Sequence, residues 1–285
     1  IVFIGNAEDF ARYDAQIDRL LFPGVGNYAH FVKQLHDRDL SEPIRRYIAS
    51  GRALMGICVG LQLLFRDSEE SPDGVKGLGY LDLLLYKFNP NDPLFTNQGL
   101  LKSVPHIGWN RVASISKGKD SFDGLLYAVN TFNKYYFVHS YAALISNAET
   151  EKKLEKYAQD GWDLVFAEYG SEKFVAAAAY GNFFATQFHP EKSGIAGIKV
   201  LKAFLEGSKY GAVKLEDLQT SLQDTEKTLG GLTRRIIACL DVRSNDQGDL
   251  VVTKGDQYNV REAGSDNQVR NLGKPVELAT RDYRQ

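Results

Sequence analysis

The 285 residues leave room for one large domain or two smaller ones, and their composition, 44% hydrophobic and 25% charged, is that of an ordinary globular protein. The net charge of −2 gives no electrostatic reason to expect nucleic acid or an anionic membrane as partner. No apolar run approaches the ~20 residues that span a bilayer.

The only cysteines of the sequence are Cys58 and Cys239, and they form no C-x-x-C pair. This argues against a disulfide framework or a zinc site and favours a reducing, cytoplasmic location. We therefore expect no metal and no cofactor. The chain opens on Ile1, so a targeting segment ahead of it, such as a plastid transit peptide, stays an open alternative.

Strand and helix patterns alternate in the first part of the chain. A buried strand is expected over 20–22, and apolar residues spaced i, i+3, i+4, i+7 predict a helix over 28–35. A second helix is expected over 41–48, a strand over 53–57, and a further helix over 61–65. This alternation is typical of a parallel sheet with covering helices.

Strand signals dominate the middle of the chain, and a helix closes it. The strands are expected over 81–88, 135–139, 164–168, 174–180 and 183–188, and the helix over 198–204. Further on, strands are expected over 235–240 and 250–252 and a helix over 275–283.

These patterns predict two domains joined by a linker. The first covers residues 1–207, a polar linker of mixed charge covers 208–231, and a second domain begins in 232–285. The last ~50 residues hold too few elements for a compact core of their own, so the second domain looks incomplete.

The pentapeptide G-I-C-V-G at 56–60 lies between an expected strand and an expected helix. Small residues two positions before and after a nucleophile permit a sharp strand-to-helix turn that exposes the nucleophile at its apex. The helix N-terminus would face the sulfur of Cys58 and favour its thiolate. The alternative is a small thiol packed at the end of a strand.

His189 is the candidate base for this nucleophile. It follows the strand expected over 183–188, and Pro190 favours extended backbone at His189. Because residues two apart in extended chain face the same way, Glu191 is expected to reach the far ring nitrogen of His189. Cys58, His189 and Glu191 then form a triad of nucleophile, base and orienting group. Alternatively, His189 is a polar strand-end residue and Glu191 is solvated.

Three segments together resemble the class I, triad-type glutamine amidotransferases: P-G-V-G at 23–26, G-I-C-V-G-L-Q at 56–62 and H-P-E-K-S at 189–193. P-G-V-G-N-Y at 23–28, P-H-I-G-W-N at 105–110 and Y-F-V-H-S-Y at 136–141 look more closely like the glutaminase of the imidazole glycerol phosphate synthase family. L-T-R-R-I-I-A-C-L-D-V at 232–242 looks like the first strand of that family's cyclase. Both parts on one chain resemble the fused, bifunctional form found in eukaryotes.

The resemblance implies an α/β fold: a class I glutamine amidotransferase domain with a mixed or parallel sheet flanked by helices, followed by the truncated start of a (β/α)8 barrel. The family's glutaminase has one more strand and helix before the region matching Ile1, so the chain is interpreted as a fragment. Two stretches, 244–249 and 263–273, lengthen the barrel opening.

The resemblance also implies an activity. Glutamine is hydrolysed to glutamate and ammonia, and the ammonia reaches a cyclase that converts the nucleotide PRFAR to imidazole glycerol phosphate and AICAR in histidine biosynthesis. Cys58 would attack the amide carbon, His189 would move the proton, and Glu191 would hold the imidazole.

Further site residues follow from the same motifs. Oxyanion donors would come from the amide of Val59 and from the strand carrying Gly24, Val25 and Gly26, with a peptide flip around Val25; an ordinary turn is the alternative for this strand. The substrate contacts would be Gln62 at the amide and His139, Ser140 and Tyr141 at the backbone ends of glutamine.

The remaining matches concern the cyclase. Trp109, Asn110 and Lys192 match the face that docks on the barrel, and Arg235 matches the gate through which ammonia enters. Asp241 matches a catalytic acid–base residue, although a turn residue is equally compatible with the pattern. Lys254 follows the family pattern without a defined role, and Cys239 is interpreted as barrel core.

Two rival interpretations remain. One is another triad-type glutamine amidotransferase or a γ-glutamyl hydrolase, against which the segment after Gly231 argues. The other is a binding module that kept the fold and lost turnover, against which the complete set Cys58, His189 and Glu191 argues.

Overall fold

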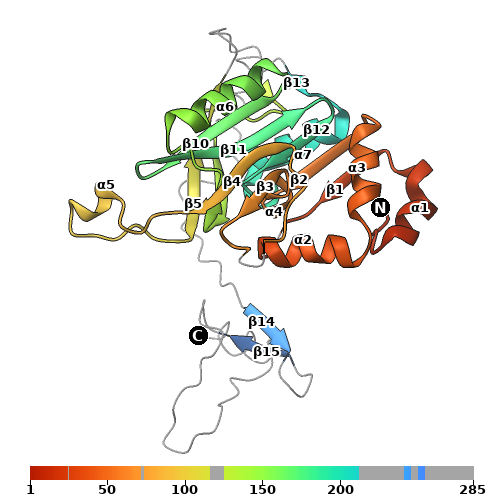
Figure 1. Ribbon diagram of the computed structural model, residues 1–285, viewed down its shortest axis with the longest axis horizontal. Coiled ribbons are helices and arrows are strands. Elements are labelled where there is room, and N and C mark those ends of the chain that lie inside the picture. The colour runs from red at the N-terminus through yellow and green to blue at the C-terminus, as the bar shows by residue number, and fades with distance from the viewer. Residues whose placement is uncertain (25, 72–73, 116–124, 212–240, 245–249, 254–285) are drawn as a thin grey trace, which may run out of the picture. The chain divides into compact units, whose positions relative to one another are not determined.

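The computed structural model describes residues 1–24, 26–71, 74–115, 125–211, 241–244 and 250–253 (Figure 1). The chain divides into two compact units, Ile1–Leu218 and Gln219–Gln285. The first unit contains a six-stranded sheet with helices, and the second contains two described strands.

The main sheet of the first unit is mixed, and its strand order is β1-β2-β12-β11-β10-β6. Neighbouring strands β1, β2 and β12 run parallel, whereas β11, β10 and β6 are antiparallel to their neighbours. The strands are β1 (Arg19–Phe22), β2 (Ala53–Ile57), β12 (Phe183–Thr186), β11 (Glu172–Tyr180), β10 (Asp163–Tyr169) and β6 (Ala113–Ile115). The mixed sheet flanked by helices is therefore confirmed.

Helices surround this sheet (Figure 1). They are α1 (Ala7–Tyr13), α2 (Tyr28–Asp37), α3 (Ser41–Ala49), α4 (Val59–Gln62), α5 (Pro93–Thr96), α6 (Ala148–Gln159) and α7 (Gly194–Glu206), with 3-10 turns η1 (Asp14–Gln16) and η2 (Pro190–Lys192). Asn27 caps α2 by accepting a hydrogen bond from the His30 amide at 2.9 Å, as Asn147 does for α6 with Thr150. The helices predicted over 28–35, 41–48 and 198–204 are confirmed.

Shorter ladders extend the unit. Strands β3 (Phe65–Ser68), β4 (Leu81–Lys87) and β9 (Tyr141–Ala142) form one sheet, β5 (His106–Arg111) pairs with β8 (Lys134–His139), and β7 (Leu125–Leu126) pairs with β13 (Tyr210–Gly211). Strand β13 lies within the linker expected over 208–231, so the first residues of that segment, as far as Gly211, pair with β7.

The helix predicted over 61–65 is wrong in its extent. Helix α4 ends at Gln62, and Phe65 begins β3, where it pairs with Leu81 of β4. Leu61, Leu64 and Phe65 are all buried, so their apolar spacing reflects a common core and not a continuing helix.

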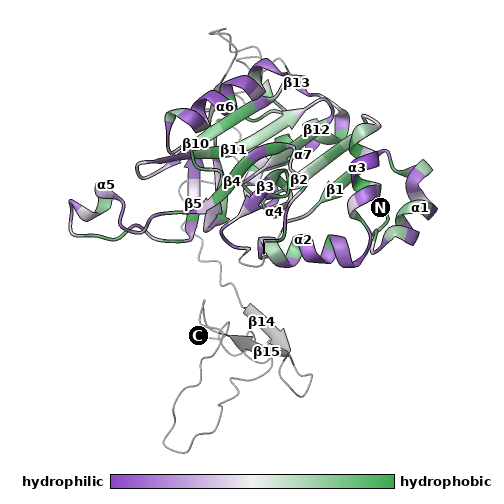
Figure 2. Ribbon diagram, viewed as in Figure 1, coloured by the Kyte–Doolittle hydropathy of each residue, from purple (hydrophilic) through white to green (hydrophobic). Residues whose placement is uncertain are grey.

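The main sheet is buried on both faces. Along β2, Leu54 and Met55 belong to different apolar clusters, and along β12 Phe183 and Phe184 do the same. Successive side chains of a strand point to opposite faces, so one cluster lies on each side of the sheet. Figure 2 shows the corresponding hydrophobic strands, with hydrophilic residues on the outer parts of α2, α3 and α6. This explains the continuous apolar runs in the sequence.

In the second unit, β14 (Asp241–Ser244) pairs antiparallel with β15 (Leu250–Thr253), and Asp241 lies opposite Thr253. The strand predicted over 250–252 is confirmed. The strand predicted over 235–240 and the helix over 275–283 lie outside the described residues. A (β/α)8 barrel consists of parallel strands joined through helices, so this antiparallel pair does not establish a barrel, which remains a prediction.

Candidate active site

Three parallel strands end at one edge of the main sheet, and each leads into a segment that the sequence marked as functional. Phe22 of β1 pairs with Gly56 of β2, and Ile57 of β2 pairs with Thr186 of β12. The chain after these strands carries Gly24, Cys58 and His189 respectively. The carboxyl ends of parallel strands are where open α/β sheets form their ligand sites.

Cys58 occupies the predicted strand-to-helix turn. It directly follows β2, precedes α4 and has φ 53° and ψ −102°, an unusual backbone conformation for a residue with a side chain. Its amide donates to the carbonyl of Thr186 at 2.6 Å, which ties the turn to β12. Strained residues of this kind are concentrated at functional sites.

The small residues around the turn are required by close backbone packing. A Cβ on Gly56 would lie 2.6 Å from the carbonyl oxygen of Gly60. A Cβ on Gly24 would lie 1.7 Å from the Ile57 carbonyl oxygen and 2.7 Å from the Val59 nitrogen. The segment after β1 is thus packed directly against the turn of Cys58 at Gly24, and only glycine fits at this position.

The thiol of Cys58 is buried, with 5% of the residue exposed. Burial raises the pKa of this thiol from 9.0 to about 12, and the amides of Val59 and Gln187 act in the opposite direction. The expectation that the helix N-terminus would favour the thiolate is therefore outweighed by desolvation. The thiol is therefore protonated near pH 7, and a nucleophilic role for Cys58 would need a base to remove its proton.

His189 is almost fully buried and pairs with Glu191. Its Nδ1 lies 2.6 Å from Oε1 of Glu191, as the sequence predicted. Burial raises the pKa of Glu191, but the hydrogen bond from His189, a backbone amide and the charges of His189 and Lys192 together outweigh it and lower this pKa below its ordinary value. The opposite ring nitrogen, Nε2, is buried and has no hydrogen-bond partner among the described residues.

The backbone reason given for this pair was wrong, although the contact is present. His189 itself is extended, with φ −97° and ψ 99°, but Pro190–Lys192 forms the 3-10 turn η2. Glu191 therefore reaches His189 by curling back along this turn. Ser193 fixes the arrangement by donating to the His189 carbonyl at 2.6 Å and accepting from the Tyr136 amide at 2.9 Å.

The predicted substrate loop lies beside the turn of Cys58. The sulfur of Cys58 is 4.0 Å from the Val138 carbonyl oxygen. Gln62 donates through Nε2 to the Tyr141 carbonyl at 3.0 Å, and Nδ1 of His139 lies 3.0 Å from the same oxygen. Ser140 follows His139 and accepts from the Phe88 amide at 3.0 Å.

Two buried histidines, His106 and His139, pack against each other at the start of this loop. The ring of His106 stacks on Phe137 and Tyr169, with centroids 5.2 and 4.0 Å apart, and its centroid lies 5.5 Å from that of His139. Burial lowers the pKa of His106 to about 4 and that of His139 to about 3, so both are neutral near pH 7. A carbonyl oxygen only accepts, so the contact with Tyr141 fixes the proton of His139 on Nδ1.

The sequence did not single out Gln187, which the structure places against the nucleophile. Its Nε2 lies 3.5 Å from the Cys58 sulfur, and its Oε1 accepts from Gln62 at 3.3 Å. The available signal was position: Gln187 precedes His189 by two residues, which places both side chains on one side of an extended chain.

The other predicted residues fall into two groups. Trp109 on β5 is 52% exposed, Asn110 donates to the Glu168 carbonyl at 2.7 Å, and Lys192 at the end of η2 is exposed. Val25, Arg235, Cys239 and Lys254 lie outside the described residues, and only the backbone of Asp241 is described.

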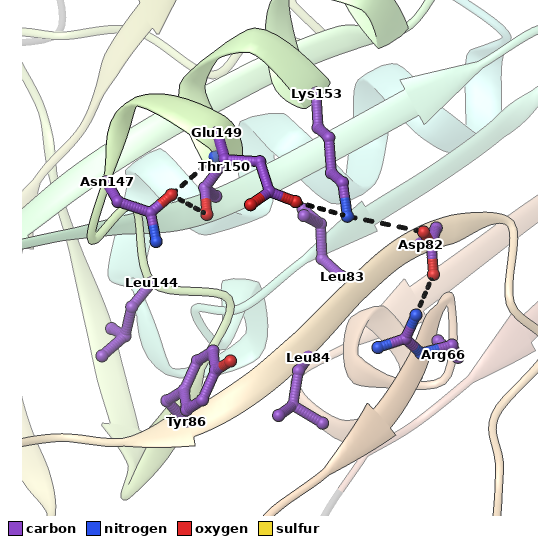
Figure 3. Close-up of a pocket in the computed structure, with 10 residues that line it drawn as sticks. All are labelled: Arg66, Asp82, Leu83, Leu84, Tyr86, Leu144, Asn147, Glu149, Thr150 and Lys153. Carbon is purple, nitrogen blue, oxygen red and sulfur yellow. Dashed lines mark hydrogen bonds and ion pairs between the residues drawn. The ribbon is translucent and has the colours of Figure 1, made fainter.

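A polar cavity of about 230 Å³ lies away from Cys58 (Figure 3). It is lined by Arg66, Asp82, Leu83, Leu84, Tyr86, Leu144, Asn147, Glu149, Thr150 and Lys153. Its charges neutralise one another: Asp82 pairs with Arg66 and lies 3.6 Å from Lys153, which is 3.5 Å from Glu149. None of the triad residues lines this cavity.

Within the described ranges, no group of three potential ligands is arranged to hold a metal ion. In the same part of the chain, no helix is both long and apolar enough to cross a membrane.

Comparison with known proteins assigns the chain to a family. Residues 6–206 match the family model of glutamine amidotransferase class-I. The imidazole glycerol phosphate synthase hisHF of Emericella nidulans is 50% identical over 94% of this chain and 45% of its own length, and that of Schizosaccharomyces pombe is 47% identical over 99% and 47%. The imidazole glycerol phosphate synthase subunit HisH of Synechococcus is 35% identical over 67% of this chain and 77% of its own length.

The chain spans about half the length of these fused relatives, 45% and 47%, but most of the HisH subunit. The family match covers the whole main sheet and the turn of Cys58 together with His189 and Glu191. The chain belongs to the class-I glutamine amidotransferase family and, within it, to the imidazole glycerol phosphate synthases.

Proposed function

We propose that the unit built on the main sheet hydrolyses glutamine to glutamate and ammonia. The observation that carries this proposal is the buried ring of His189, whose Nδ1 lies 2.6 Å from the half-exposed carboxylate of Glu191, at the same sheet edge as the strained turn of Cys58. Nucleophile, base and orienting group come from the ends of neighbouring strands, as triad chemistry requires.

Cys58 acts as the nucleophile on the side-chain carbonyl carbon of glutamine. His189 takes the thiol proton through Nε2, which is buried and unpartnered, and later gives it to the departing ammonia. Glu191, whose lowered pKa keeps it anionic, holds Nδ1–H and stabilises the imidazolium. Water then hydrolyses the thioester, which releases glutamate and restores the thiol.

Activation is a necessary step in this scheme. No hydrogen bond joins the Cys58 sulfur to His189 in the structure, because the thiol is held by Gln187 and faces the Val138 carbonyl. The thiol must turn toward Nε2 when glutamine binds. The oxyanion donors we propose are the amide of Val59 and an amide of the segment 24–26, and the close packing of Gly24 on the turn of Cys58 supports a coupled movement.

The glutamine pocket is proposed between the turn of Cys58 and the loop at 139–141. Gln62, His139 and the Tyr141 carbonyl are already joined by hydrogen bonds there. Gln62 would contact the amide of the substrate, and His139, Ser140 and Tyr141 its backbone ends.

We further propose that the ammonia passes to a cyclase fused on the same chain, which converts PRFAR to imidazole glycerol phosphate and AICAR. Support comes from the fused relatives and from the segment after Gly231. Trp109 and Ile107, each 52% exposed on β5, would supply the docking face for the cyclase. Asn110 and Lys192, which the family resemblance assigns to the same face, would join them. Asp241, Arg235 and Lys254 would serve the cyclase.

The experiment compares glutamine hydrolysis by the complete enzyme with and without PRFAR or its product analogue. Stimulation is expected if a ligand of the cyclase promotes the movement that turns the Cys58 thiol toward His189. A glutaminase rate that does not respond would favour a different triad amidotransferase or a γ-glutamyl hydrolase. Failure of a glutamine-analogue electrophile to label Cys58 would favour a binding module without turnover.

A further inference from the structure

A hydrogen-bonded chain of two buried amides ends on the sulfur of Cys58. Gln62 and Gln187 are 3% and 1% exposed, so their amide groups depend on each other and on the backbone for partners. Gln62 Nε2 lies 3.0 Å from the Tyr141 carbonyl oxygen and 3.3 Å from Gln187 Oε1. Gln187 Nε2 lies 3.5 Å from the sulfur.

The Tyr141 carbonyl fixes how the two side-chain amides, those of Gln62 and Gln187, are oriented. The Tyr141 carbonyl can only accept, so the amide group of Gln62 must present NH₂ to it. The second hydrogen of that NH₂ then points at Gln187, which must present its oxygen. Gln187 is left with its own NH₂ facing the sulfur of Cys58, and it cannot turn over without breaking the bond to Gln62.

We propose that Gln187 is a positioning residue for Cys58, held by Gln62, which donates a hydrogen bond to the sulfur and stabilises it when it becomes charged. A donor to an anion strengthens as the charge develops, so its effect falls on the thiolate more than on the thiol. Because Gln62 is also proposed to contact the substrate amide, the hydrogen bonds through Gln62 and Gln187 connect the glutamine pocket to Cys58. This inference rests on the proposed glutaminase function.

The test measures how fast a chloroketone analogue of glutamine labels Cys58 in the complete enzyme between pH 6 and 10. The thiolate displaces chloride to form a thioether, and peptide mass spectrometry distinguishes Cys58 from Cys239. Gln187→Met keeps the side-chain length and removes the donor. Gln187→Glu replaces the donor by a carboxylate, and Gln98→Met, at an exposed glutamine on the same unit, is the matched control.

Gln187→Met is expected to displace the rise of the labelling rate with pH by about one unit toward higher pH, which slows labelling about tenfold at pH 7. Gln187→Glu is expected to displace it further, and Gln98→Met to leave it unchanged. A purely structural role for Gln187 would lower the melting temperature without displacing the labelling profile. Coincident profiles for Gln187→Met and wild type would overturn the proposal.

Different results would contradict the glutaminase function and the role of Gln187. If the wild-type enzyme is not labelled at Cys58, the glutaminase function itself is wrong. If Gln187→Met does not fold, Gln62→Met gives the second measurement, because it leaves Gln187 in place without its partner. A smaller displacement of the labelling profile toward higher pH is expected there, and an unchanged profile would contradict the inferred hydrogen bonds from Gln62 through Gln187 to Cys58.

Discussion

Lowering the pH from 7 to 5 is expected to destabilise the unit that carries the active site, because His106 and His139 are buried as neutral rings. Burial lowers the pKa of His106 from 6.5 to about 4, with repulsion from Lys102 adding to it, and lowers that of His139 to about 3. His106 is enclosed between the rings of Phe137 and Tyr169, which offer its unpartnered Nδ1 no acceptor.

The unfolding free energy falls as the pH falls because the unfolded state binds more protons than the folded state. In the unfolded chain both imidazoles titrate near pH 6.5, so below that pH the unfolded state binds protons that the folded state does not. The stabilisation is therefore complete above pH 6.5 and is lost as the pH falls toward 4. Between pH 7 and 5 each histidine costs about 2 kcal/mol, which makes about 4 kcal/mol for the pair. Glu191, with its lowered pKa, titrates below this range.

Urea unfolding at the two pH values measures this difference. Both tryptophans, Trp109 and Trp162, lie in the unit under test, so their fluorescence reports its unfolding. His106→Phe keeps an aromatic ring in the stack and removes the titrating group, so the loss is expected to fall to about 2 kcal/mol. His30→Gln, at an exposed helix position, is expected to leave it at about 4 kcal/mol. A His106→Phe protein that loses as much stability as wild type would refute the reasoning.

Three substitutions test other contacts of the unit that contains Cys58. Gly24→Ala places a Cβ 1.7 Å from the Ile57 carbonyl oxygen, so labelling of Cys58 by a glutamine analogue should be lost, and wild-type labelling would contradict the packing. Lys102→Met leaves Asp92, its fully buried partner at 3.0 Å, without a cation, so unfolding free energy should fall by about 3–5 kcal/mol; a loss below about 1 kcal/mol would show that Asp92 is not dependent on this ion pair. Glu191→Gln removes the charge that holds His189 and should slow glutamine hydrolysis by about a hundredfold or more, whereas exposed Glu155→Gln should have no effect.

The local patterns of the sequence predicted the elements that carry the site, because burial on both sheet faces leaves long apolar runs. The strand before Cys58 was found in this way, whereas the contact between His189 and Glu191 was expected from extended backbone and is made through a 3-10 turn. The helix after the turn was extended too far, since the apolar spacing at Leu61, Leu64 and Phe65 is satisfied by a four-residue helix followed by a strand.

What the sequence could not supply are properties that depend on tertiary enclosure. The raised pKa of Cys58 arises from burial by segments distant in the chain, and it reverses the effect expected from the helix N-terminus. The position of Gln187 two residues before His189 does not by itself indicate a contact with Cys58, and this contact emerges only from the enclosure of Gln187 between Cys58 and Gln62.

The most direct test of the proposed glutaminase is the Cys58→Ala variant of the complete enzyme, assayed for imidazole glycerol phosphate formation with two nitrogen sources. Synthesis from glutamine should be abolished, because the nucleophile is missing, while synthesis from added ammonia should continue at the wild-type rate. Retention of glutamine-dependent synthesis, or loss of both activities, would contradict the role assigned to Cys58.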